Sequence, residues 1–172
     1  MTDTREDNLQ EIAQIALGSI RDMVAALECD RERLGELRKQ CDDYDPGTIA
    51  EKLKGSIAEQ WAVDHPAEAN ELAALEKSAD EARERIQADP LSIEYRTGWM
   101  SRRETVERDD WAEACILLAT GGPAVRIIVE LHDGEPHRAY LQVQDWGTPW
   151  TEYYEEGIGE LLMTYVAVFC SE

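Results

Sequence analysis

Apolar positions change their spacing near Pro90. Before Pro90, apolar and small residues recur every three or four positions, which is typical of helices. After Pro90 they alternate with polar residues, which is typical of strands with one covered face. The pattern predicts an α+β protein. We expect a helical region over residues 1–90 and, over 91–172, an antiparallel sheet of about four strands packed on a C-terminal helix, with more helix than strand.

The first predicted helix is long, from about Asp7 to Gln40. Its apolar and small positions follow a heptad spacing that is interrupted by Asp30: Leu9, Ala13, Ala16, Ile20, Met23, Leu27, Leu34, Leu37 and Cys41. A heptad spacing indicates a helix that packs along a second helix. Two interpretations stay open. The helix folds back within the chain as a helical hairpin, or it dimerises as a coiled coil in which Asp30 sets the register.

Two further helices are predicted before Pro90. Thr48 and Glu51 have the spacing of a capping box, so a second helix should begin near Ile49 and end before Pro66. Proline is favoured in the first turn of a helix, so a third helix should begin at Pro66 and continue toward Asp89.

Alternation predicts the strands of the second half at 93–96, 111–120, 125–131 and 139–144. Turn residues lie at 121–123 and 133–136, and short turns between successive strands favour an antiparallel meander. A closing helix is predicted over about 155–170. Its apolar face comprises Ile158, Leu161, Leu162, Tyr165, Val166 and Phe169, which matches the apolar face of the sheet.

The segment from Gln144 to Tyr154, QDWGTPWTEYY, is rich in aromatic residues. It holds two of the five tryptophans and two of the six tyrosines, with Gly147 and Pro149 among them. Glycine and proline disfavour a regular helix or central strand, so a rigid aromatic loop is expected. The rings either close the core or form a recognition surface, since Trp and Tyr are frequent at interaction hot spots. The candidate contact residues are Trp146, Trp150, Glu152 and Tyr153.

The formal net charge of the chain is −20. Both halves contribute, with 22 acidic against 11 basic residues before Pro90 and 15 against 6 from there on. A field of this sign repels phosphate backbones and anionic membranes, so we expect no direct nucleic-acid or membrane binding. A basic or nucleic-acid-binding protein is the expected partner, although high charge also serves solubility alone. The acidic candidates for such a contact are Asp42, Asp43, Asp45, Glu104, Glu107, Asp109 and Asp110.

Sites for catalysis, metals and cofactors are not predicted. His132 and His137 flank a hairpin turn and are interpreted as solvated polar residues. The four cysteines are scattered without a CxxC pair, as in a reduced cytoplasmic protein. Thr120–Pro123 lacks the pattern of a phosphate-binding loop. Apolar runs are too short for a membrane span, and no secretory signal precedes the polar start, so the expected location is the cytoplasm.

Three blocks of the second half resemble a family of small proteins from bacteriophages, prophages and plasmids. The blocks are DPLSIEYRTGW at Asp89–Trp99, ILLATGGPAVRI at Ile116–Ile127 and LQVQDWGTPWTEYY at Leu141–Tyr154. The resemblance implies an accessory role for a mobile element inside a bacterial cell, and it implies no catalytic residues.

Together these observations favour a non-enzymatic interaction protein that inhibits a bacterial defence complex, such as a CRISPR or restriction complex, by protein contact or by mimicry of nucleic acid. One alternative is a small-ligand protein or enzyme whose pocket includes Trp146, Trp150 and Tyr153. Another is a structural or assembly protein of a virion, dimerised through its first helix.

Overall fold

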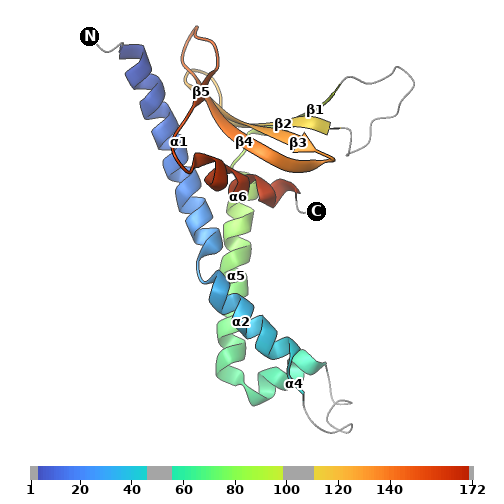
Figure 1. Ribbon diagram of the computed structural model, residues 1–172. Coiled ribbons are helices and arrows are strands. Elements are labelled where there is room, and N and C mark those ends of the chain that lie inside the picture. Colours follow the sequence, from blue (N-terminus) through green and yellow to red (C-terminus); the bar gives the residue numbers. More distant parts are fainter. Residues whose placement is uncertain (1–3, 46–55, 99–110, 171–172) are drawn as a thin grey trace. The chain divides into compact units, whose positions relative to one another are not determined.

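The computed structural model describes residues 4–45, 56–98 and 111–170 (Figure 1). Contacts divide the chain into two compact units. Unit 1 comprises Met1–Val24 and Glu84–Glu172, and unit 2 comprises Ala25–Arg83. The predicted α+β class is confirmed, and helical residues outnumber strand residues among those described. The elements are α1 (Thr4–Glu28), α2 (Arg31–Asp42), α4 (Ile57–Asp64), α5 (Pro66–Ala88), β1 (Ser92–Thr97), β2 (Trp111–Ala119), β3 (Ala124–His132), β4 (Glu135–Gln144), β5 (Thr151–Tyr153) and α6 (Ile158–Cys170).

The sheet of unit 1 is an antiparallel meander in the order β1-β2-β3-β4-β5. β3 and β4 are joined by the two-residue turn Asp133-Gly134, whose φ angles of 51° and 76° are both positive, as a type I′ hairpin requires. The predicted count of four strands is wrong, because β5 adds a fifth. Its three residues pair with Leu141–Val143 of β4, and so short a strand inside the aromatic segment has no alternation to reveal it.

One face of the sheet carries the core of unit 1. Ile116, Ile127 and Leu141 stand side by side across β2, β3 and β4, and each is at most 2% exposed. α6 packs against β4 and lies across this side of the sheet (Figure 1). The helix contributes five buried side chains, Ile158, Leu162, Tyr165, Val166 and Val168. Burial of these apolar surfaces is the main force that holds unit 1 together.

The first part of α1 belongs to unit 1. Ala13, Leu17 and Ile20 recur at helical spacing and are at most 1% exposed. These three side chains therefore face the interior of the protein, whereas Ile15 in the same stretch is 69% exposed. The division predicted at residue 90 separated a helical region from a sheet region. The boundaries of the compact units instead fall inside α1 and inside α5, so each of these helices belongs partly to both units.

The long helix predicted over 7–40 is interrupted. α1 ends at Glu28, and Asp30 adopts a left-handed conformation with φ 56° before α2 begins. Aspartate tolerates this conformation better than most residues, which allows the chain to turn there without glycine. The last helix also begins later than predicted, at Ile158, because Gly157 with φ 80° precedes it.

The described part of unit 2 is mainly helical. Leu37 of α2 and Trp61 of α4 are buried, at 0% and 3% exposure. Arg33 of α2 donates two hydrogen bonds of 2.8 Å to Glu71 of α5, and these bonds lower the pKa of the Glu71 carboxyl. Helix α5 begins at Pro66, as predicted.

The start of α4 is fixed by a complete capping box. The Ser56 side chain accepts from the Glu59 backbone N–H, and the Glu59 carboxylate accepts from the Ser56 N–H. The capping box predicted at Thr48 and Glu51, and the helix start near Ile49, lie outside the described residues.

Candidate interaction surface

Four residues of the aromatic segment, Asp145–Thr148, form a tight turn, which we call the Trp146 turn. The Thr148 N–H donates to the Asp145 carbonyl oxygen at 3.0 Å, and Gly147 has φ 70°. A positive φ at the third residue is the mark of a type II turn and explains the glycine. Trp146 therefore occupies the corner of the turn.

Asp145 and Thr148 hold the turn from within. The Thr148 hydroxyl accepts from the Asp145 N–H at 3.1 Å and donates to the Asp145 carbonyl at 2.9 Å. Oδ1 of Asp145 accepts from the Trp146 N–H at 2.8 Å, and Oδ2 accepts from the Asn8 amide of α1 at 2.9 Å. The turn is thus fixed both by its own groups and by a neighbouring helix.

The Trp146 indole lies against Gly122, which belongs to the connection between β2 and β3. A Cβ atom added to Gly122 would stand 2.2 Å from Cε2 and 2.3 Å from Nε1 of Trp146, so only glycine leaves room for the ring. Even so, Trp146 is 76% exposed. The ring is positioned by the backbone beneath it while most of its surface faces solvent.

Trp150 lies on the other face of the sheet from the core. The Arg126 guanidinium stands 4.1 Å from the centroid of the Trp150 ring, and its Nε donates to the Gln142 amide oxygen at 2.8 Å. A guanidinium stacked on a tryptophan makes a favourable cation–π contact. Trp150 is half-buried by this arrangement.

Glu152 forms an ion pair with Arg138 on the sheet. Its carboxylate lies 3.5 Å from Arg138, which is also 3.5 Å from Glu130. Exposed ion pairs of this length contribute little to stability, so the carboxylate of Glu152 stays accessible to another cation.

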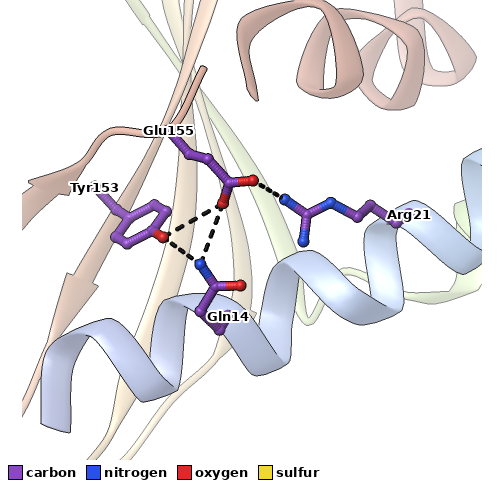
Figure 2. A network of polar contacts seen from close by, with 4 residues as sticks. All are labelled: Gln14, Arg21, Tyr153 and Glu155. Carbon is purple, nitrogen blue, oxygen red and sulfur yellow. Dashed lines mark hydrogen bonds and ion pairs between the residues drawn. The ribbon is translucent and has the colours of Figure 1, made fainter. Parts of the chain in front are cut away.

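Tyr153 points toward α1 and joins a polar network (Figure 2). The Gln14 amide donates to the Tyr153 hydroxyl and, at 3.2 Å, to Glu155. Tyr153 donates to the same carboxylate at 3.4 Å, and Arg21 forms an ion pair with it. The network ties α1 to the end of β5, so the hydroxyl of Tyr153 has a structural role.

The acidic candidates are only partly described. Asp42, Asp43 and Asp45 are exposed at the end of α2 in unit 2. The remaining four, Glu104, Glu107, Asp109 and Asp110, lie outside the described residues. The structure therefore describes only the three acidic candidates at the end of α2.

Reactive side chains do not converge in the part of the chain that the structure describes. There, no group of three or more His, Cys, Asp or Glu residues is placed to hold a metal ion. Burial raises the pKa of the Cys115 thiol, which disfavours the reactive thiolate. His132 and His137 are exposed on either side of the β3–β4 turn.

The sequence identified Trp146 as a candidate contact residue but did not reveal the residues that hold the aromatic segment in place. The two glycines of TGGP signalled a turn, yet nothing local showed that Gly122 would carry the ring of a residue 24 positions away. Asn8 and Gln14 carried no signal at all, because their partners are fixed only by the packing of α1.

Comparisons with known proteins gave no match: none was found among protein-family models, curated proteins or solved structures. Across the described ranges, no helix is both long and apolar enough to cross a membrane.

Proposed function

We propose that this chain is a non-enzymatic interaction protein of a phage or another mobile element, and that it binds a host protein through the Trp146 turn. The observation that carries the proposal is a large aromatic side chain that is 76% exposed yet fixed by a hydrogen-bonded turn and by Gly122. A side chain already held in place loses little conformational entropy on binding. Tryptophan is also the residue type most enriched at binding hot spots.

The proposed target is a bacterial defence complex, such as a CRISPR or restriction complex. The choice follows from the resemblance predicted for the three blocks and from the net charge of −20. Complexes that handle nucleic acid present basic grooves, and an acidic protein is attracted to such a surface. In this proposal the charge speeds the encounter, and Trp146 supplies the short-range contact.

Mimicry of nucleic acid is the stronger form of the same proposal, in which acidic side chains occupy the groove themselves. The two forms differ in their dependence on salt. Exposed charge pairs are screened within about 8 Å at physiological ionic strength, whereas apolar contact is not. Affinity that falls steeply with salt favours mimicry, and affinity that changes little favours the Trp146 turn as the main contact.

The geometry favours contact over a ligand pocket built from the aromatic rings. Trp146 lies on Gly122, Trp150 lies under Arg126, and Tyr153 points toward α1. The three rings therefore do not face a common cavity. A virion protein dimerised through its first helix is also less favoured, because Ala13 and Ile20 of the predicted seam of α1 are already buried.

The test is affinity capture from the bacterial host with the full chain as bait, followed by mass spectrometry. Trp146→Ala is compared with Val63→Ala, since Val63 is a similarly exposed apolar side chain, at 78%, in unit 2. We expect the unmodified chain and Val63→Ala to recover a nucleic-acid-binding defence complex. Trp146→Ala should lose at least about 2 kcal/mol of binding free energy, as hot-spot truncations do.

Circular dichroism of both variants checks that they are folded. Equal capture by Trp146→Ala and by the unmodified chain would show that the turn is not the contact. Recovery of capsid or tail proteins would contradict the defence target and favour a role in virion assembly.

A further inference from the structure

A cleft in unit 1 lies between α1 and the ends of β2 and β3, and its volume is about 270 Å³. Five residues of α1 between Ile12 and Ile20 form one wall. Leu118, Ala119, Pro123 and Val125 form another, and Asp89 completes the lining. Eight of these ten residues are apolar, so the cleft is suited to an aliphatic group.

Large apolar side chains at and near the cleft are exposed although they belong to a highly charged protein. Ile15, which lines the cleft, is 69% exposed. Leu91, two residues beyond Asp89, is 59% exposed. Exposed apolar residues that gather around a concavity are typical of an interaction site rather than of a solvated surface.

The carboxylate of Asp89 makes the cleft suited to a cationic group. It is half-buried, and Tyr165, which is fully buried, donates to its Oδ2 at 2.7 Å. This hydrogen bond fixes the carboxylate at the edge of the cleft. A carboxylate accepts several hydrogen bonds, so a second donor can join Tyr165. A carboxylate beside an apolar surface is best stabilised by a cation.

We infer that this cleft binds a segment of the partner protein that carries an aliphatic side chain beside a lysine or an arginine. The aliphatic group enters the cleft between Ile12 and Val125, and the cation pairs with Asp89. The net charge of −20 favours the approach of such a basic segment. The inference rests on the proposed function and names the chemistry of the partner.

The first test uses small peptides and the full chain, so it does not depend on knowledge of the partner. Methyl NMR spectra are recorded with acetyl-Leu-Arg-amide, and the two controls are acetyl-Leu-Glu-amide and acetyl-Gly-Arg-amide. We expect saturable shifts of the Ile12, Ile15 and Val125 methyl groups with the Leu-Arg peptide. Both controls should bind about tenfold more weakly, because each lacks one of the two contacts.

Variants then assign the binding to the cleft. Asp89→Asn keeps an acceptor for Tyr165 and should weaken the Leu-Arg peptide about tenfold. Ala16→Leu should fill the cleft and abolish the shifts. Glu160→Gln makes the same change of charge in the first turn of α6, outside the cleft lining, and should leave the affinity unchanged.

Equal binding of Leu-Arg and Leu-Glu peptides would overturn the inference, as would shifts that appear with protein concentration alone and so indicate a second copy. Host capture separates the two proposals. If Trp146→Ala abolishes capture while Asp89→Asn and Ala16→Leu do not, the cleft is not a partner site and the Trp146 turn still is. If the peptide binds as expected while Trp146→Ala captures the partner normally, the Trp146 turn is not the partner contact. The cleft is then still supported as a binding site.

Discussion

Gly122 is the residue on which the position of Trp146 depends. Gly122→Ala would place a methyl group 2.2 Å from Cε2 of the indole, so the ring must move away. We expect the indole N–H resonance of Trp146 to change and the variant to capture less partner, as Trp146→Ala should. The free energy of unfolding should fall by about 1–3 kcal/mol, as for other overpacked contacts. An unchanged indole resonance would show that the ring does not rest on this glycine.

Gly159 offers the matched control. It lies in α6, and a Cβ there meets nothing within 4 Å. Gly159→Ala should therefore leave Trp146 in place and stabilise the helix by up to about 1 kcal/mol, because alanine has the higher helix propensity. Thermal unfolding of the two variants side by side separates the effect of a methyl group on the ring from the effect of glycine loss in general.

Tyr165 links stability to pH. Burial, with the hydrogen bond to Asp89, raises the pKa of the Tyr165 hydroxyl. The unfolded chain therefore releases this proton first as pH rises above about 10, and the folded state loses stability there. Below that pH the contribution is fully present. Tyr165→Phe should cost about 1 kcal/mol at neutral pH and make the alkaline decline shallower in urea unfolding.

The matched control for Tyr165 is Tyr154→Phe, since Tyr154 is 82% exposed. Its alkaline decline should follow that of the unmodified chain. A Tyr165→Phe variant with the same alkaline decline would show that this hydroxyl is not the group responsible.

Helix α1 is held by apolar burial more than by its polar contacts. Leu17 is fully buried, and Leu17→Ala should cost about 2–5 kcal/mol because it leaves a cavity. Arg21 is 41% exposed and pairs with Glu155, so Arg21→Ala should cost less than about 1 kcal/mol. Denaturant unfolding of both variants measures the contrast. Equal costs would mean that the network of Figure 2 holds the helix as strongly as the core does.

The charge of the whole molecule acts against its compact state. With a net charge of −20, repulsion among like charges should exceed the attraction of the scattered ion pairs. Sodium chloride screens that repulsion, so physiological salt should raise stability by about 1 kcal/mol relative to low salt, or Tm by roughly 2–4 °C. An uncharged osmolyte at equal osmolality is the control. A fall in Tm with salt would show that the ion pairs dominate instead.

Self-association is a second property of the whole molecule. Ala13, Leu17 and Ile20 of α1 are already buried in the single chain, so these positions are not free to pair with a second copy. We expect sedimentation equilibrium to give a monomer at every concentration tested. A concentration-dependent dimer would revive the coiled-coil interpretation of the first helix.

The sequence by itself determined the kinds of element and most of their positions, because those depend on local periodicity and on turn residues. It placed the start of α5 at Pro66 and a turn within 133–136, since proline and glycine set the conformations open to the backbone at their own positions. It also selected Trp146 as a candidate, because a tryptophan beside glycine and proline stands out by composition alone.

Only the tertiary structure decided which of these residues meet. The contacts of Gly122 with Trp146, of Gln14 with Tyr153 and of Asp89 with Tyr165 each join residues far apart in the chain. No local pattern encodes such pairs, because burial and hydrogen bonding between distant segments select them when the chain folds. The same physics added β5 and enclosed the first part of α1 within unit 1, and it formed the cleft beside Asp89.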